Sequence, residues 1–296
     1  MLKRTLVFSS PVYLSLRNCQ LVMTYKNLPD DSQTIPIEDI AVVVIENQMV
    51  TASMPLLNAL VDANVSVVLC NNKGMPNAML QNLDSHNLQG EILRNQMEAG
   101  EVLKKKLWKQ IVEAKIKNQS LLLSKMGKHG EKLKPYYSNV KSGDSDNREG
   151  IAARIYFQEL FGDDFIRDRT KLGVNACLNY GYTILRASVA RALVSSGLSP
   201  AIGIFHHNRS NAFPLVDDFM EPYRPYVDEI VYEMCQTRVI EELDREAKAK
   251  LINVLYCDTK FNTVTRPLQV GLSISSASLV KCYAKDELKL SFPTIE

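Results

Sequence analysis

A histidine and two acids that could hold a metal ion lie close together in the second half of the sequence. His206 precedes Asp218 and Glu221, which are three residues apart and so share one face of a helical turn. An imidazole nitrogen beside carboxylate oxygens suits Mg²⁺ or Mn²⁺, and less selectively Fe²⁺ or Zn²⁺. The spacing alone leaves a second interpretation open, in which the acids flank a helix and His206 makes a buried hydrogen bond.

Glu149 is a fourth candidate ligand, and it lies earlier in the chain. It stands at the start of a helix expected over residues 151–161, where exposed backbone amides and the helix dipole favour an acidic side chain. Asp146 or Asn147 is placed to cap this helix. Acids at helix starts are common, but with the histidine and the acid pair Glu149 completes the minimum set for an ion that activates a hydroxyl against a phosphodiester.

Lysines are concentrated in one segment. Ten of them, and only three acids, lie between Glu101 and Lys134. Apolar residues over residues 102–112 recur with the 3.6-residue period of a helix. We expect a basic helix whose lysines have no acidic partner one turn away. Two interpretations stay open: a solvated helix face, as for most charge runs, or a surface that binds phosphates.

Residues 1–75 are expected to form a small β-rich domain. Apolar and polar residues alternate over residues 12–17 and 21–25, which predicts two strands, and residues 28–32 have the composition of a turn. Residues 37–45 end in a valine-rich run typical of a strand buried on both faces. A short helix that begins at Pro55, a strand over residues 65–70 and a cluster of loop formers complete the domain.

Residues 76–90 are expected to be a linker, and residues 91–296 an α-helical domain. Besides the basic helix, periodicity predicts helices over residues 151–161, 174–196, 215–220, 226–234 and 241–255, and a last one near Pro267. Residues 136–148 are rich in Ser, Gly, Asn and Asp and are expected to form a loop. The predicted fold class is α+β, with the strands first and the helices after them.

The composition is that of an ordinary globular protein. The 296 residues are 46% hydrophobic and 23% charged, with a net charge of +2, which excludes collagen-like, low-complexity and wholly disordered classes. The longest apolar run has six residues, against the ~20 of a membrane span, and no signal peptide is recognisable. The six cysteines form no C-x-x-C pair. We therefore expect free thiols, a cytoplasmic protein and no contact with a membrane.

Four stretches of the sequence resemble a known family, the CRISPR-associated spacer integrases, which are the universal adaptation proteins of CRISPR immunity. The stretches follow one another in the order found in that family, and the likeness is greatest to its type II branch. They are IPIEDIAVVVIEN at residues 35–47, EGIAARIYF at 149–157, NACLNYGYTILR at 175–186, and the run over 197–228 that begins GLSPAIG and ends DFMEPYRPYVD.

The resemblance implies an architecture and a set of partners. The N-terminal domain would be β-sandwich-like and would form most of a homodimer interface. The helical domain would be catalytic and would bind double-stranded DNA. A small ferredoxin-like partner of the CRISPR adaptation module would join two dimers in a heterohexamer. A type II effector nuclease and an accessory adaptation protein are further candidate partners in the prokaryotic cytoplasm.

The resemblance also implies the reaction and its residues. The 3′-hydroxyl of a short duplex would attack a phosphodiester at the edge of a CRISPR repeat, a transesterification that inserts a new spacer and needs no enzyme nucleophile. The catalytic ligands of Mg²⁺ or Mn²⁺ would be Glu149, His206 and Glu221. Asp218 would lie close by. The adjacent His207 is the alternative ligand, although the spacing from Gly203 matches His206.

Cationic side chains would hold the DNA, because they bind phosphates irrespective of sequence. We expect this from Arg209 and from the lysine cluster, which consists of Lys104, Lys105, Lys106 and Lys109. Tyr180 would help to hold the strand end, unless it is a core tyrosine with a satisfied hydroxyl. The rival function is a non-catalytic DNA-architectural protein of the same complex, which loss of a ligand would favour. A phosphohydrolase for small nucleotides lacks its glycine-rich phosphate loop here.

Overall fold

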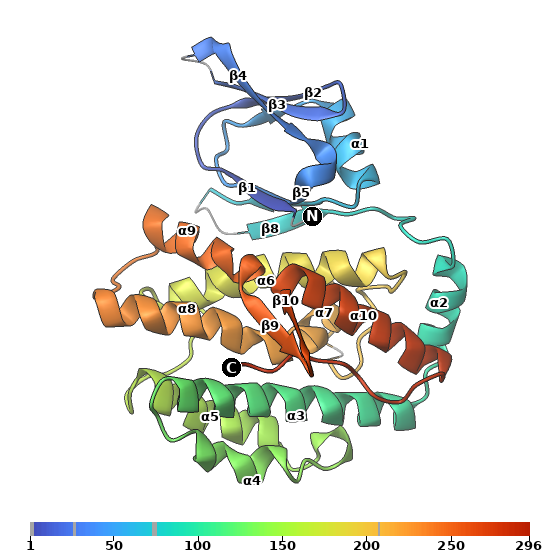
Figure 1. The fold of residues 1–296 in the computed structure, drawn as a ribbon, viewed down its shortest axis with the longest axis vertical. Helices are drawn as coiled ribbons and strands as arrows, with labels where there is room; N and C mark the ends of the chain where they lie inside the picture. The colour runs from blue at the N-terminus through green and yellow to red at the C-terminus, as the bar shows by residue number, and fades with distance from the viewer. Residues whose placement is uncertain (1–2, 26–27, 73–75, 207) are drawn as a thin grey trace. The chain divides into compact units, whose positions relative to one another are not determined.

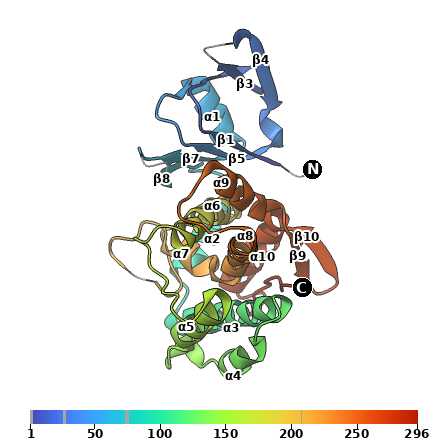
Figure 2. The same ribbon diagram turned by 90° about the vertical axis from the view of Figure 1, so that its left-hand side faces the viewer.

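The computed structural model describes residues 3–25, 28–72, 76–206 and 208–296. His207, the alternative histidine, lies outside these ranges. The chain divides into two compact units, Met1–Asn87 and Leu88–Glu296. Figures 1 and 2 show strands in the first unit and mainly helices in the second, so the expected α+β class is confirmed.

Two four-stranded sheets make up most of the described part of the first unit. One sheet has the order β1-β5-β7-β8, from Arg4–Phe8, Ile40–Ile45, Ser66–Cys70 and Pro76–Leu80. In it β5 is parallel to both neighbours, and β8 is antiparallel to β7. The other has the order β4-β3-β2-β6, from Leu28–Pro36, Gln20–Tyr25, Tyr13–Arg17 and Thr51–Ala52. Two helical segments, η1 (Ile37–Asp39) and α1 (Met54–Asp62), complete the unit.

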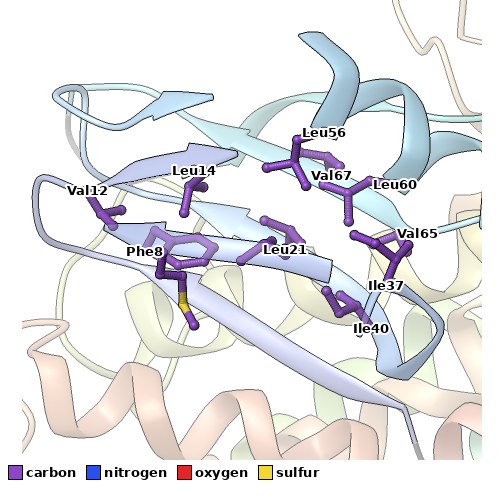
Figure 3. Packing of buried hydrophobic residues seen from close by; sticks show 12 residues of the cluster. Phe8, Val12, Leu14, Leu21, Ile37, Ile40, Leu56, Leu60, Val65 and Val67 are labelled. Carbon is purple, nitrogen blue, oxygen red and sulfur yellow. The ribbon is translucent and has the colours of Figure 1, made fainter. Parts of the chain in front are cut away.

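An apolar core holds this unit together (Figure 3). Leu14 and Leu21 come from neighbouring strands, and Leu56 and Leu60 come from one face of α1. The period-two pattern therefore predicts β2 and β3 correctly, because alternate residues point to the same face of a strand. The valine-rich run is also buried as expected: the first five residues of β5 are buried, and the last, Ile45, is partly buried.

The strands of the first unit that the sequence does not predict all lie at sheet edges. They are β1, β4, β6 and β8, the outer members of the two sheets. The predicted turn over residues 28–32 is wrong, because these residues lie in β4. The predicted linker over residues 76–90 is also wrong at its start, where residues 76–80 form β8. Edge strands pair on one side only and so tolerate proline and acidic residues that interior strands exclude.

Helices form most of the second unit. The longer ones are α2 (Gln89–Met97), α3 (Glu101–Lys125), α5 (Arg148–Phe161), α6 (Val174–Ser195), α7 (Pro214–Phe219), α8 (Arg224–Thr237), α9 (Arg245–Ile252) and α10 (Leu268–Ala284). The shorter ones are η2 (Gly130–Leu133), α4 (Lys134–Tyr137), η3 (Ser142–Asp144), η4 (Glu221–Tyr223) and η5 (Asn253–Tyr256). The helix predicted from residue 241 begins only at Arg245, because the Asp244 carboxylate caps it by accepting from the Ala247 N–H.

Two expectations for this unit are wrong. The unit is not wholly helical, since β9 (Asp258–Phe261) and β10 (Val264–Pro267) form an antiparallel hairpin. Its two-residue turn places Asn262 at φ +50°, a conformation that asparagine tolerates. The segment over residues 136–148 is not a continuous loop either, because it contains the end of α4, all of η3 and the start of α5.

Two buried amide side chains fix the turns on which the candidate ligands lie. Asn118, on the buried face of α3, donates from Nδ2 to the carbonyl of Pro222 at 2.8 Å. Gln96 of α2 donates from Nε2 to the carbonyls of Ser199 and Ile202, both at 3.0 Å, and accepts from the Ser199 N–H. Buried polar side chains of this kind hold irregular backbone in one conformation.

Two further findings concern the helices and the cysteines of the described residues. Among them, no helix combines the length and the apolar character needed to cross a bilayer. The six cysteines are free thiols, as expected, and Cys70, Cys177 and Cys282 are buried.

Candidate active site

Glu149 lies in the first turn of α5, where the carboxylate of Asp144 fixes the backbone. Asp144 accepts hydrogen bonds from the N–H of Arg148 at 2.8 Å and from the N–H of Glu149 at 3.0 Å. Asn147 occupies the N-cap position, as predicted, but neither Asp146 nor Asn147 caps the helix with its side chain. Asn147 has a left-handed backbone, with φ +52°, and its side chain makes no capping bond, while Asp146 binds the Arg148 guanidinium. A residue outside the usual capping position therefore orients the candidate ligand.

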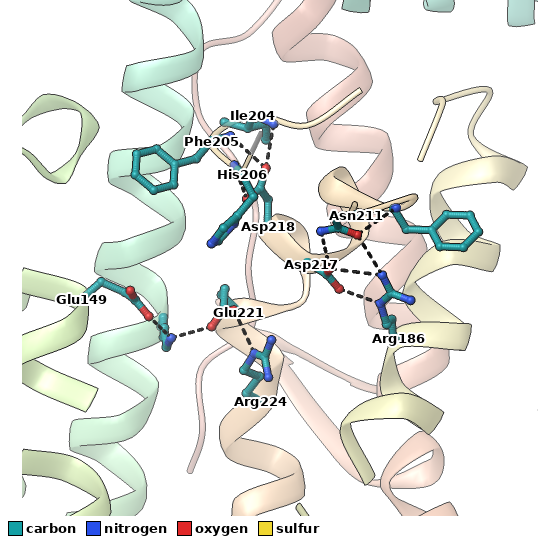
Figure 4. A network of polar contacts seen from close by, with 12 residues as sticks. Glu149, Arg186, Ile204, Phe205, His206, Asn211, Asp217, Asp218, Glu221 and Arg224 are labelled. Carbon is teal, nitrogen blue, oxygen red and sulfur yellow. Dashed lines mark hydrogen bonds and ion pairs between the residues drawn. The ribbon is translucent and has the colours of Figure 1, made fainter. Parts of the chain in front are cut away.

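His206 lies in the loop between α6 and α7, and a buried carboxylate holds this loop in place (Figure 4). Asp218 of α7 has no exposed surface. Its Oδ2 accepts hydrogen bonds from the backbone N–H of Ile204 at 2.7 Å and of Phe205 at 2.9 Å, and its Oδ1 accepts from the N–H of His206 at 3.2 Å. Asp218, expected near the metal, thus uses both oxygens to anchor the loop.

The same carboxylate orients the imidazole of His206. Nδ1 lies 2.5 Å from Asp218 Oδ1, so we assign the proton to Nδ1 and leave Nε2 as an acceptor. This hydrogen bond raises the pKa of His206 against the opposing effect of partial burial, and the charges of Glu221 and Glu149 add to the rise. Figure 4 shows the ring directed toward the side on which these two glutamates lie. A histidine held by a carboxylate in this way is a common metal ligand.

Gly203 allows the loop to pass close to the elements beneath it. A Cβ at this position would lie 2.8 Å from the carbonyl oxygen of His206 and 2.9 Å from Cβ of Pro214. Such contacts are shorter than real side chains make, so any other residue would displace the loop. The glycine that marks His206 by its spacing is therefore required for steric reasons.

Aromatic rings support the loop from the other side. Phe205 stacks on Trp108 of α3, with ring centroids 4.4 Å apart and planes 2° from parallel. The His206 ring stands edge-on to both, at 5.5 Å from each centroid. Trp108 is buried, whereas Phe205 is 44% exposed. The only tryptophan of the chain therefore lies in contact with the candidate site.

Glu221 lies at the start of η4 between two cations. Its Oε1 accepts from Nε of Arg224 at 2.9 Å, and its Oε2 lies 2.5 Å from Nζ of Lys115. Burial acts to raise the pKa of Glu221, but the charges of Arg224 and Lys115 outweigh it and lower this pKa to about 2. The bond from Asn118 to the Pro222 carbonyl holds the turn. Glu221 is therefore a fixed and ionised carboxylate.

Lys115 of α3 joins Glu221 to Glu149. Its Nζ contacts Oε1 of Glu149 as well as Oε2 of Glu221, and its side chain is only 8% exposed. Burial acts to lower the pKa of Lys115, but the two carboxylates outweigh it and raise this pKa. The structure thus brings two of the predicted ligands, from α5 and η4, to one positive charge.

The donor set fits a hard divalent ion. Two carboxylates meet at one cation, and Nε2 of His206 is available on the same side of its loop. In the part of the chain that the structure describes, no three His, Cys, Asp or Glu side chains lie close enough together to form a complete metal site. The ammonium of Lys115 lies between the carboxylates instead. Two of the three expected ligands, Glu149 and Glu221, therefore contact a lysine ammonium in this structure, and their oxygens, with Nε2 of His206, are donors of the kind that such an ion takes.

The residues expected to contact phosphates differ in their exposure. Lys105 and Lys106 are exposed on α3, and Arg209 is exposed in the loop after His206. The other two members of the lysine cluster are half-buried. Lys109 lies 3.6 Å from Glu113, one turn along the helix, so the expectation that it lacks an acidic partner is wrong. Such an exposed ion pair is weak and leaves the lysine able to exchange partners.

Tyr180 has no surface to offer to a DNA strand. Its side chain is completely buried in α6, and the ammonium of Lys248 lies 5.5 Å from its ring centroid. The expected contact with a strand end does not agree with this burial. The alternative interpretation, a core tyrosine, fits the structure.

The sequence prediction misses three residues of the site. Arg224 could have been found, because it follows Glu221 by three residues and such pairs meet on a helix. Lys115 carries no distinguishing signal, since it is one of ten lysines in its segment. Asp144 carries none either, because three residues separate it from α5 and both Asp144 and Asn147 have positive φ, which places it outside the usual capping pattern.

Solved structures with the same arrangement define the class of fold. The chain superimposes on a casposase bound to integration product with a TM-score of 0.80 and 18% identity, covering 98% of this chain and 92% of that one. It also superimposes on a chain of a Cas6-RT-Cas1–Cas2 complex with a TM-score of 0.74 and 20% identity, covering 97% of this chain and 35% of that longer one.

Sequence comparison then gives the family. The chain belongs to the CRISPR associated protein Cas1 family, whose pattern it matches over residues 5–266. It is 40% identical over 256 residues to a CRISPR-associated endonuclease Cas1 of Neisseria meningitidis serogroup C (strain 8013), an alignment that covers 86% of this chain and 83% of the relative. The family resemblance of the four sequence stretches is confirmed.

Proposed function

We propose that this protein is a metal-dependent DNA integrase and endonuclease that inserts short duplexes into a CRISPR array. The observation that carries the proposal is the meeting of Glu149 and Glu221 at one buried cation, beside the acceptor nitrogen of His206. The family supports the same role, because its Neisseria relative is named an endonuclease and a casposase bound to integration product shares the fold.

Each residue of the site has a definable part. Glu149, Glu221 and Nε2 of His206 would hold one Mg²⁺ or Mn²⁺, which when bound lowers the pKa of a hydroxyl and neutralises charge on a phosphate. Asp218 keeps the imidazole proton on Nδ1, so that Nε2 stays an acceptor. Arg224 keeps Glu221 ionised and in place.

The proposed reaction exchanges one phosphodiester for another. The 3′-oxygen of the short duplex forms a bond to phosphorus in the repeat, and the bond from that phosphorus to the 3′-oxygen of the repeat breaks. The proton lost by the attacking hydroxyl is balanced by one gained by the leaving oxygen. Since the number of phosphodiester bonds is unchanged, the protein needs no nucleophile of its own and no energy source. With water in place of the hydroxyl, the same site would hydrolyse DNA.

The proposal includes assembly and DNA binding. The exposed cations Lys105, Lys106 and Arg209 are available for phosphates. We expect a homodimer formed mainly by the first unit, and a larger complex with a small ferredoxin-like partner. A chain of the same fold in a Cas6-RT-Cas1–Cas2 complex supports the second point. Light scattering of the mixture that shows nothing larger than the dimer would contradict it.

Strand transfer of a labelled duplex into a supercoiled plasmid that carries a CRISPR repeat tests the function. The assay uses Mg²⁺ or Mn²⁺, with and without the partner. We expect labelled plasmid from a duplex with 3′-hydroxyl ends and none from one with 3′-dideoxy ends. Glu149→Ala, His206→Ala and Glu221→Ala should each abolish transfer and stay folded, His207→Ala should be milder, and the exposed control Glu131→Ala should be unaffected.

Two results would count against this function. Transfer at the wild-type rate by folded Glu149→Ala would remove the site from the reaction. A protein that binds the duplex but never transfers it, with either ion, would favour the DNA-architectural alternative.

A further inference from the structure

We propose that Lys115 is an internal cation that takes the place of the divalent ion in the metal-free protein and is displaced when the ion binds. The inference rests on the proposed function, because it takes Glu149 and Glu221 as metal ligands. It goes further, because it gives a role to a residue outside the ligand set and says what limits the affinity of the site for its ion.

The geometry places the ammonium of Lys115 where an ion would contact both carboxylates. Nζ lies 2.5 Å from Oε2 of Glu221 and also contacts Oε1 of Glu149. The two glutamates come from η4 and α5, and the lysine comes from the middle of α3. Its helix neighbours Ile111, one turn earlier, and Asn118, one turn later, are both buried, so the lysine stands on the buried face of α3. Buried lysines are rare unless they are paired.

The charges of the pocket balance without a metal. Glu149 and Glu221 supply two negative charges, and Lys115 and Arg224 supply two positive ones. A divalent ion added to these four groups would leave two excess positive charges, and the side chains of Lys115 and Glu221 are each only 8% exposed. Such an excess is unfavourable because buried charges are poorly screened. Departure of the Lys115 ammonium reduces this excess of positive charge.

The chemistry of the ammonium makes the two cations exclude each other. A protonated lysine has three donors and no lone pair, so it cannot become a ligand of the ion. The ammonium contacts Oε1 of Glu149 and Oε2 of Glu221, so an ion held by these two carboxylates would compete with it. Arg224 can stay, because it binds the other oxygen of Glu221. The flexible four-carbon side chain lets Lys115 leave while the α3 backbone keeps its place.

This exchange should weaken metal binding, since the ion must first break two ion pairs. The test is titration of purified protein with Mn²⁺ alone, followed by calorimetry, with circular dichroism to show folding. Lys115→Met keeps the length of the side chain and removes its charge, so we expect Mn²⁺ to bind about tenfold more tightly than in the wild type. Without metal, Lys115→Met should also melt at a lower temperature than the wild type, and Mn²⁺ should raise its melting temperature by more.

A matched control and a second variant separate this effect from others. Lys117→Met makes the same change of charge two residues along α3, at an exposed position, and should bind Mn²⁺ as the wild type does. Lys115→Arg keeps a cation in the pocket and should bind Mn²⁺ no more tightly than the wild type.

The outcomes decide the inference independently of the proposed function. If Lys115→Met binds Mn²⁺ no more tightly than the wild type and Lys117→Met, the inference is overturned. If Lys115→Met does not fold without metal, Lys115→Arg decides, and tighter binding by that variant overturns the inference. Failure of the proposed function would show differently, as absence of strand transfer by the wild-type protein under conditions in which it binds the ion.

Discussion

Replacing Asp218 with asparagine should release the loop that carries His206, with almost no change in side-chain volume. Asp218 accepts four hydrogen bonds, two at each oxygen. An amide has only one acceptor oxygen, so two of the four donors must face its NH₂ group. We expect the oxygen to stay with the N–H groups of Ile204 and Phe205, because Ile204 is buried. The backbone N–H and the ring of His206 then lose their acceptor.

The size of the effect follows from these contacts. A hydrogen bond to a charged group contributes about 1.5 to 3 kcal/mol, so two lost bonds correspond to about 3 to 6 kcal/mol. The His206 side chain is 46% exposed and can turn toward water. We therefore expect Asp218→Asn to lower the free energy of unfolding by about 2 to 4 kcal/mol. Asp217→Asn, the neighbouring change, disturbs a more exposed pair with Arg186 and should cost about 1 kcal/mol.

Urea unfolding followed by tryptophan fluorescence measures this difference. Trp108 is the only tryptophan and stacks on Phe205, so its emission reports on the loop itself. Strand transfer should fall in the same variant, because the His206 ring is no longer directed toward the glutamates. Equal stability of Asp218→Asn and Asp217→Asn, or transfer at the wild-type rate, would refute the anchoring role of Asp218.

Three further results are expected. Asp228 is buried and accepts from the hydroxyls of Tyr156 and Tyr182, and burial raises its pKa to about 6. Because the folded protein then keeps a proton that the unfolded chain has lost, stability should fall by about 2 kcal/mol as the pH rises from about 4 to about 7. Urea midpoints across this range should lack that fall in Asp228→Asn, and parallel curves would contradict the raised pKa. Asp144→Ala removes two hydrogen bonds from the start of α5 and should lower stability by about 1 to 2 kcal/mol, seen as a lower melting temperature, and slow strand transfer through displacement of Glu149. Replacing the lysine cluster with glutamine should weaken duplex binding for every sequence and reduce the slope of log K against log salt by up to about 0.9 per lost contact, whereas an unchanged slope in a folded variant would remove α3 from the DNA path.

Interior strands of the first unit could be predicted from the sequence, and edge strands could not. β5 carries an unbroken apolar run, because both of its faces are buried, and β2 and β3 carry the alternation typical of a strand. β4 contains Pro29, Asp30 and Asp31, which read as a turn. Its pairing with β3 depends on the rest of the sheet, so the local composition does not predict it. The hairpin of the second unit escapes prediction for a similar reason, since its strands have four residues each.

The residues of the candidate site also differ in how well the sequence predicts them. Glu149, His206 and Glu221 could be selected because their side chains are chemically unusual in their surroundings. Lys115 could not, because lysine is the commonest charged residue of its segment and only the folded chain shows which one is buried. The sequence predicts that Asp218 lies near His206, but it does not predict that Asp218 binds the backbone N–H groups of the loop. A sequence cannot show whether a carboxylate faces an ion or such N–H groups.

Gln96 gives the candidate site a mechanical link to the rest of the chain. α2 is the first helix after the boundary at Asn87, and the fully buried Gln96 side chain holds the loop backbone at Ser199 and Ile202, just before the turn that carries His206. Because Gln96 belongs to α2, a shift of this helix would strain these hydrogen bonds and disturb the loop backbone that precedes His206.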